Sequence, residues 1–244
     1  MPSWPCSTPH QNQTEPPTNA GHERLFASVV GVSNQLAVHQ PTLLGGIEPT
    51  LAPAAVTERI PLDATSWIDV TREWLHGADE LATRLIERVQ WRQGRRRMWD
   101  RVLDDPRLSY WTRADDPPFH PCVPEMHHAL ERTYRHPLRR PGLNYYRNGR
   151  DSVAWHADRE LRELDDTLVA IVTLGTHRPF LVRPTGGGPS IDLAPASGDL
   201  LVMGGAAQRD WEHAVPKTSR TGPRVSVSWR WTSGRSIPAS ETRP

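Results

Sequence analysis

Residues 143–158 read LNYYRNGRDSVAWHAD, and this stretch decides how the rest of the chain is interpreted. Two short runs of alternating side chains, 143–147 and 152–156, flank an Asn-Gly turn signal, as expected of two β-strands. Successive residues of a strand point to opposite faces, so residues two positions apart share a face. His156 and Asp158 therefore lie on one face, where the second strand ends. The stretch predicts a strand that presents an imidazole and a carboxylate side by side.

Short strands continue through the C-terminal part of the chain. We predict them at 168–174, 179–183, 190–193, 199–203, 211–215 and 223–231. Turns separate them and long helices do not, which favours an antiparallel double-sheet roll over a parallel α/β sheet. Two earlier segments, 78–90 and 123–134, repeat apolar residues at helical spacing. The sequence predicts an α+β chain in which helices precede a β-roll core.

A second histidine and two arginines complete a possible metal and co-substrate site. His213 lies on the predicted strand 211–215, while Arg224 and Arg230 alternate with Val and Trp along 223–231 and so share a polar face. Two imidazoles and one carboxylate suit a non-haem Fe(II) centre with open positions, and guanidinium groups pair bidentately with carboxylates. Zinc with the same ligands remains chemically possible. The arginine pair favours Fe(II) with an organic acid.

Six ordered motifs strongly resemble AlkB-like dioxygenases, which are Fe(II)/2-oxoglutarate enzymes that repair alkylated nucleic-acid bases. The motifs are the opening stretch 143–158, TLG at 173–175, FLVR at 180–183, GDLLVMGG at 198–205, WEH at 211–213 and PRVSVSWR at 223–230. The resemblance implies a double-stranded β-helix, or jelly-roll, core with flanking N-terminal helices and a nucleotide-recognition lid.

The resemblance also implies roles for individual residues. The iron ligands would be His156, Asp158 and His213. The 2-oxoglutarate ligands would be Asn144, Tyr146, Arg224 and Arg230. The lid would be the insert 91–121, and the substrate-binding residues would be Arg96, Arg97, Trp99, Tyr110, Trp111, Glu160 and Arg183. Guanidinium groups grip phosphates, and aromatic faces stack on an extruded base.

The implied reaction is oxidative demethylation or dealkylation of alkylated bases in DNA or RNA. It uses Fe(II), O2 and 2-oxoglutarate and releases succinate, CO2 and formaldehyde. Ser226 departs from the family, which usually has Asn at this position; Ser keeps a donor and an acceptor on a shorter side chain.

Two alternatives stay open. A 2-oxoglutarate-dependent hydroxylase or demethylase of a protein, a lipid or a small metabolite would keep the metal ligands and the arginine pair without needing a basic, aromatic lid. A metal-free binding roll would need none of this chemistry.

Composition bounds the remaining expectations. The 29 basic and 28 acidic residues nearly cancel, so net charge does not by itself indicate a polyanionic partner. Two cysteines provide neither a disulfide framework nor a cysteine-based zinc site. The chain lacks a long apolar run and an apolar N-terminal segment, so we expect a cytoplasmic monomer without a membrane span. The expected organisation is a largely disordered tail at 1–56, helices and lid at 57–137, and the dioxygenase core at 138–234.

Overall fold

The computed structural model describes residues 47–98, 101–220 and 222–233. Its strands are β1 (Thr50–Leu51), β2 (Thr57–Pro61), β3 (Ser66–Thr71), β4 (Leu75–His76), β5 (Arg92–Met98), β6 (Arg101–Trp111), β7 (Gly142–Tyr146), β8 (Val153–His156), β9 (Thr167–Gly175), β10 (Leu181–Pro184), β11 (Ile191–Asp192), β12 (Leu200–Gly205), β13 (Trp211–Val215) and β14 (Arg224–Thr232). Its helices are α1 (Ala78–Arg88), α2 (Cys122–Tyr134) and α3 (Ala207–Asp210).

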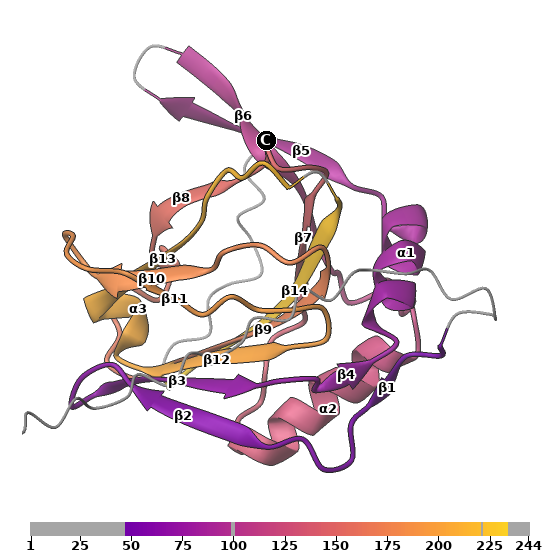
Figure 1. The fold of residues 1–244 in the computed structure, drawn as a ribbon, viewed down its shortest axis with the longest axis horizontal. Helices are drawn as coiled ribbons and strands as arrows, with labels where there is room; N and C mark the ends of the chain where they lie inside the picture. Colours follow the sequence, from indigo (N-terminus) through magenta and orange to yellow (C-terminus); the bar gives the residue numbers. More distant parts are fainter. Residues whose placement is uncertain (1–46, 99–100, 221, 234–244) are drawn as a thin grey trace, which may run out of the picture. The chain divides into compact units, whose positions relative to one another are not determined.

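These strands form two facing antiparallel sheets and a short strand pair (Figure 1). The large sheet has the order β2-β3-β12-β9-β14-β7-β6-β5, the small sheet has the order β11-β10-β13-β8, and β1 pairs with β4. Every strand expected between 143 and 231 is present, with ends shifted by a few residues. The arrangement agrees with the expected antiparallel double-sheet roll.

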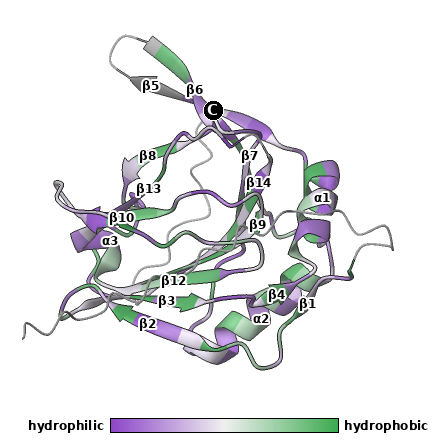
Figure 2. Cartoon of the chain, in the orientation of Figure 1, coloured by the Kyte–Doolittle hydropathy of each residue, from purple (hydrophilic) through white to green (hydrophobic). Residues whose placement is uncertain are grey.

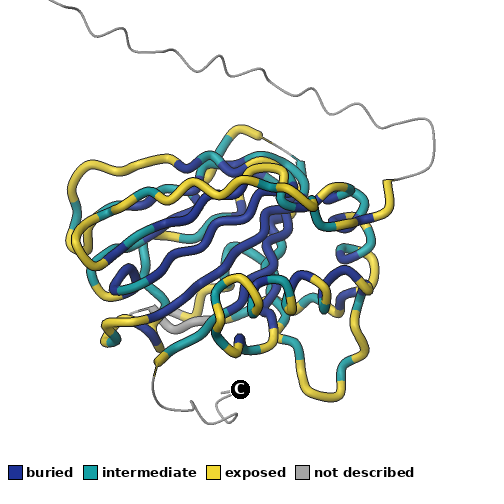
Figure 3. Tube along the Cα trace, turned by 90° about the horizontal axis from the view of Figure 1, so that it is seen from below, coloured by how far each residue is buried: buried dark blue, intermediate teal, exposed yellow. Residues whose placement is uncertain are grey.

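The central strands of the large sheet are covered on both faces. Along β9, Leu168 and Val172 belong to a cluster that includes α1 and α2, whereas Val169 and Ile171 belong to a second cluster that includes the small sheet. Figure 2 shows the hydrophobic character of β12, and Figure 3 shows burial along the central strands with exposed residues in the loops. The face of the large sheet that carries Val169 and Ile171 is therefore the one that lies toward the small sheet.

Helices α1 and α2 lie where the apolar spacing predicted them. Leu81 and Leu85 of α1 are fully buried, as is Met126 of α2. Helix α2 is capped by the residue that follows it, Arg135, whose backbone is left-handed (φ 58°). The N–H of Arg135 donates to the Glu131 carbonyl oxygen. Each helix buries one stripe against the large sheet and leaves charged residues on the other side.

The insert between the helices is a β-hairpin, which the sequence analysis did not predict. β5 pairs with β6, and the last four residues of β6 pair with β7, from Leu108 opposite Tyr145 to Trp111 opposite Gly142. We call this element the β5–β6 hairpin. It continues the large sheet past β7, and Figure 1 shows it projecting from the edge of that sheet.

Regular structure begins earlier than residue 57, where the sequence pattern placed its start. Thr50 and Leu51 form β1, which pairs with β4. β2 and β3 then join the large sheet through β12, so this sheet takes strands from both sides of residue 137. Within the part of the chain that the structure describes, no helix has the length and apolarity needed to cross a membrane.

Candidate metal and co-substrate site

Three potential metal ligands meet between the two sheets. His156 ends β8, Asp158 follows two residues later, and His213 lies directly opposite His156 on β13. One ligand atom from each residue lies within 4.8 Å of the others. Antiparallel pairing brings together residues 57 positions apart, because the strand after α3 returns beside β8. The arrangement gives two imidazoles and one carboxylate on one side of a possible metal ion.

The histidines are held in the form that a metal ion needs. The Nδ1 atom of His156 lies 2.9 Å from the Ala154 carbonyl oxygen and 3.1 Å from that of His213. Since carbonyl oxygens only accept, Nδ1 carries the ring proton and Nε2 keeps a free lone pair. Burial lowers the pKa of both rings; that of His213 falls to about 3, with a further contribution from the nearby His156. Both rings are therefore neutral at pH 7.

The carboxylate is ionised and anchored. Burial of Asp158 would raise its pKa, but the charge of Arg230 and a hydrogen bond from it outweigh burial and hold the pKa at about 2. Arg230 Nε donates to Asp158 Oδ2 at 2.6 Å, and Arg230 Nη1 donates to Ser228 Oγ at 3.2 Å. One predicted co-substrate residue is thus in direct contact with a predicted metal ligand.

A cavity of about 240 Å³ extends from these ligands between the sheets. The even-numbered residues of β14 that line it are Arg224, Ser226, Ser228 and Arg230, and the neighbouring β7 contributes Asn144 and Tyr146. Val225, Val227 and Trp229 point the other way, into the core with α1 and α2. The predicted alternation on β14 is confirmed, and its polar face lines a cavity.

Arg224 lies deep in this cavity with hydrogen-bonding capacity to spare. The residue is 1% exposed, and its Nη2 donates to Thr173 Oγ1 at 3.1 Å. Its Nε has no hydrogen-bond partner among the described residues. Burial lowers its pKa from the ordinary arginine value. A buried guanidinium with an unpaired N–H is costly unless an anion pairs with it, so this residue fits a carboxylate ligand.

Trp111 borders the cavity at the surface. Its side chain is 60% exposed, and the Arg230 guanidinium lies 5.0 Å from the ring centroid. Gly142, the residue opposite on β7, lets the ring lie close, because a Cβ there would come within 2.6 Å of the ring. Glu160 also lines the cavity, and its carboxylate is 3.9 Å from Arg139 Nη1.

Two other predicted substrate residues lie away from the cavity. Tyr110 points to the opposite face of β6, where its hydroxyl donates to Asp116 Oδ2 at 2.9 Å and its ring packs edge-on against Phe119. Adjacent residues of a strand face opposite ways, so Tyr110 and Trp111 cannot share a surface. Arg183 lies over the Trp155 ring, with 4.0 Å to the centroid, and its Nε donates to Glu212 at 2.6 Å.

The remaining predicted residues belong to the β5–β6 hairpin. The backbones of Arg96 and Arg97 pair with those of Leu103 and Val102. Trp99 lies outside the described residues.

Sequence reasoning missed Arg107. This residue lines the cavity, and its Nε donates to Asn144 Oδ1 at 2.9 Å. It lies on β6 four residues before Trp111, on the same face of the strand. Recognising 101–111 as a strand would have found it, because the two-residue period places Arg107 and Trp111 together.

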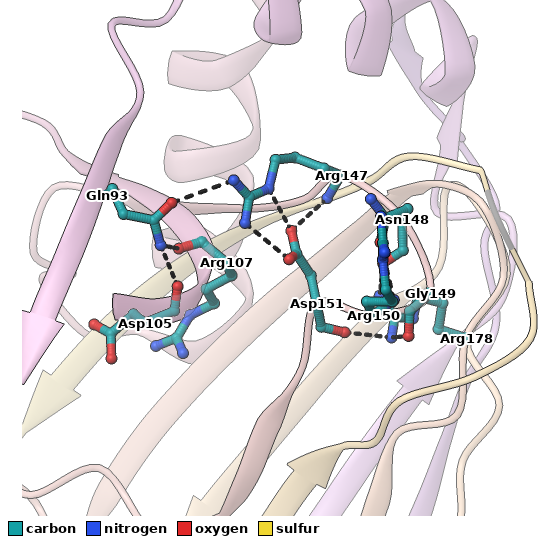
Figure 4. A network of polar contacts seen from close by, with 9 residues as sticks. All are labelled: Gln93, Asp105, Arg107, Arg147, Asn148, Gly149, Arg150, Asp151 and Arg178. Carbon is teal, nitrogen blue, oxygen red and sulfur yellow. Dashed lines mark hydrogen bonds and ion pairs between the residues drawn. The ribbon is translucent and has the colours of Figure 1, made fainter. Parts of the chain in front are cut away.

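A polar network fixes the turn that follows β7 (Figure 4). Arg147 donates from Nε and Nη2 to the carboxylate of the buried Asp151, and from Nη1 to Gln93 Oε1 of the hairpin at 3.2 Å. Arg178, fully buried, donates to the carbonyl oxygens of Asp151 at 2.6 Å and Pro216 at 2.9 Å. The network connects the hairpin, the end of β7 and the loop before β14.

A family model described as the 2OG-Fe(II) oxygenase superfamily matches residues 82–236. The chain belongs to this superfamily. Membership implies Fe(II), 2-oxoglutarate and O2 as the cofactors and co-substrates. The donor set fits this assignment, with one ligand atom from each of two neutral imidazoles and an ionised carboxylate within 4.8 Å of one another.

Relatives of this chain confirm the AlkB-like resemblance. Alpha-ketoglutarate-dependent dioxygenase alkB homolog 3 of Homo sapiens is 30% identical over 174 residues, which cover 63% of this chain and 61% of the relative. DNA oxidative demethylase ALKBH2 of Arabidopsis thaliana is 33% identical over 112 residues, 36% of each chain. The chain thus spans about three fifths of the length of the first of these relatives.

A solved structure supports the fold assignment alone. The prolyl hydroxylase from Trichoplax adhaerens, in complex with a hypoxia inducible factor oxygen degradation domain peptide fragment, superimposes with a TM-score of 0.53 at 10% identity. The superposition covers 68% of this chain and 83% of that chain.

Proposed function

We propose that this dioxygenase removes alkyl groups from damaged bases of DNA or RNA by oxidation, and so acts in repair. The observation that carries the proposal is the cavity itself, which is lined by the three candidate metal ligands and bordered by the exposed ring of Trp111. A flat aromatic face beside a reaction centre suits a base that has been turned out of its stack. A relative named as a DNA oxidative demethylase points the same way.

In this proposal the metal ion is held by His156, Asp158 and His213. Arg224, buried and incompletely paired, would bind the carboxylate of 2-oxoglutarate that lies farther from the metal. Arg230, which is bonded to Asp158, would bind the part of 2-oxoglutarate that lies nearer the metal. Asn144 and Tyr146 line the same wall and would orient the remaining oxygens.

The bound cofactors supply the oxidising chemistry, in which O2 and 2-oxoglutarate yield succinate and CO2 and an N-methyl carbon is hydroxylated and lost as formaldehyde. The protein residues place the alkyl group and exclude competing reactions. Trp111 would stack on the base, and Glu160 borders the same space with a carboxylate that can accept from an exocyclic amine. The arginines of the β5–β6 hairpin would contact phosphates.

Product analysis tests this function. Iron-loaded protein is incubated with 2-oxoglutarate and oligonucleotides, DNA or RNA, that carry a methylated base, and succinate and formaldehyde are quantified. Formaldehyde should appear with the methylated oligonucleotide and not with its unmethylated counterpart, and Asp158→Ala should abolish it. If 2-oxoglutarate is consumed but neither nucleic acid yields formaldehyde, a hydroxylase of another substrate becomes the better assignment.

A further inference from the structure

Gln208 connects the two segments that carry the candidate metal ligands. It is fully buried in α3, the short helix that leads directly into β13 and His213. Its Oε1 accepts a hydrogen bond from the backbone N–H of Asp158 at 2.9 Å, across 50 residues of sequence. One side chain therefore joins the end of the His156–Asp158 segment to the segment of the second histidine.

The orientation of the Gln208 amide is determined by this contact. A backbone N–H only donates, so the oxygen and not the nitrogen of the amide must face it. The amide nitrogen lies 3.8 Å from Met203 Sδ, and a thioether is a weak acceptor. The bond to Asp158 is thus the stronger of the two polar contacts that hold the Gln208 amide.

Each polar group of Asp158 has a partner from a different part of the chain. The carboxylate accepts from Arg230 of β14, and the carbonyl oxygen accepts from the backbone N–H groups of Leu161 at 2.8 Å and Arg162 at 3.1 Å. The backbone N–H depends on Gln208. A buried N–H without a partner is costly, so removing the Gln208 oxygen should let the backbone at Asp158 move to find another partner.

We propose that Gln208 is a positioning residue for the metal centre. It fixes the backbone of Asp158 and, through it, the direction of the carboxylate toward the two imidazoles. This inference rests on the proposed assignment of His156, Asp158 and His213 as the metal ligands. Residues that orient metal ligands typically change metal affinity by about 10- to 100-fold when they are replaced.

The test measures the affinity of the whole metal-free chain for Mn(II). Free Mn(II) is quantified by its EPR signal. Gln208→Met keeps the length and burial of the side chain but has no amide oxygen, so Mn(II) affinity should fall by about 10- to 100-fold. Gln208→Glu keeps an acceptor oxygen at the same reach and should retain more affinity than Gln208→Met. Gln90→Met, at an exposed position after α1, is the matched control and should bind as the unsubstituted protein does.

Thermal unfolding in the presence of a chelator distinguishes positioning from a general loss of structure. The proposal expects Gln208→Met to unfold in the same cooperative way as the parent while binding Mn(II) more weakly. If Gln208→Met does not fold, Gln208→Asn, whose amide is one methylene shorter, makes the same comparison.

Asp158→Ala distinguishes a failure of the role of Gln208 from a failure of the metal-site assignment. If Asp158→Ala loses Mn(II) while Gln208→Met binds like the parent, Gln208 has no positioning role and the metal site stands. If Asp158→Ala itself keeps the parent's affinity, the metal site is misassigned, and the role of Gln208 is overturned with it.

Discussion

Arg230 and Asp158 form a direct ion pair, with 2.6 Å between the arginine Nε and the aspartate Oδ2. From the sequence, Arg224 and Arg230 were expected to share one polar face of a strand and to bind one organic acid. In the structure Arg230 is bonded to a candidate metal ligand, and Arg224 is bonded to Thr173. The two arginines therefore differ in what their replacement should affect.

Replacing Arg224 should impair co-substrate binding without impairing metal binding. A charge-assisted hydrogen bond contributes about 1.5–3 kcal/mol, so Arg224→Met should raise the 2-oxoglutarate concentration needed for half-maximal turnover by roughly tenfold or more. Mn(II) affinity should stay unchanged, because Arg224 contacts none of the three metal ligands in the described hydrogen bonds. An unchanged 2-oxoglutarate requirement would remove Arg224 from the co-substrate site.

Metal affinity should persist to lower pH than an ordinary histidine site allows. Protons compete with the metal ion for the ligands, and burial lowers the pKa of His213 to about 3 and also lowers that of His156. Mn(II) affinity measured across pH should therefore begin to fall only below the ordinary histidine value of about 6.5. A fall centred at or above that pH in the unsubstituted protein would contradict the environment described for the rings.

Arg230→Met should shift the same profile toward higher pH. The charge of Arg230 lowers the pKa of Asp158 and contributes to the lowered pKa of His213. Without that charge both groups bind protons more readily, so protons displace the metal ion at a higher pH. Arg224→Met, which keeps the Arg230 ion pair, serves as the control.

Gly142 should control substrate binding through Trp111. A Cβ at this position would come within 2.6 Å of the ring, so Gly142→Ala should displace the ring from the cavity wall. Oligonucleotide affinity should fall by ~1–3 kcal/mol, the same loss that is expected of Trp111→Ala, while 2-oxoglutarate turnover without nucleic acid persists. Tyr110→Phe removes a hydroxyl that bonds to Asp116 on the other face and should change neither quantity.

The arginines of the β5–β6 hairpin should determine the salt dependence of binding. Replacing Arg95, Arg96 and Arg97 with Ala removes up to three phosphate interactions. Each one removed should flatten the slope of log affinity against log salt by roughly 0.7–0.9. Arg132→Ala, an exposed arginine of α2, is the control and should leave the slope unchanged. Identical slopes in all variants would argue that the hairpin does not meet nucleic acid.

The candidate metal ligands and the polar wall of the cavity could be predicted because they follow from alternation along single strands. Once β14 is recognised, Arg224 and Arg230 must share a face opposite Val227 and Trp229. The meeting of His156 with His213 required only that β13 return beside β8, which an antiparallel roll permits. The two-residue period of a strand and the antiparallel topology were sufficient to predict these residues.

The hairpin and Gln208 could not be found in this way. β5 has the sequence RQGRRRM, which lacks apolar alternation, and the strand lies at the edge of the sheet. Because residues 101–111 were not predicted to form a strand, both Tyr110 and Trp111 were predicted to bind the substrate. The role of Gln208 depends on a contact between a side chain and a backbone amide 50 residues away, and no local pattern encodes such a contact.

The division of β6 into two parts has a practical consequence for engineering. Residues 108–111 are in register with β7, whereas residues 101–104 pair with β5 alone. The outer half of the hairpin thus pairs only within itself. Its base is held by β7, and this base carries Trp111 and adjoins Arg107. Under the proposed function, exchanging only the outer half for that of another hairpin would change the contacts to nucleic acid and leave the cavity between the sheets intact.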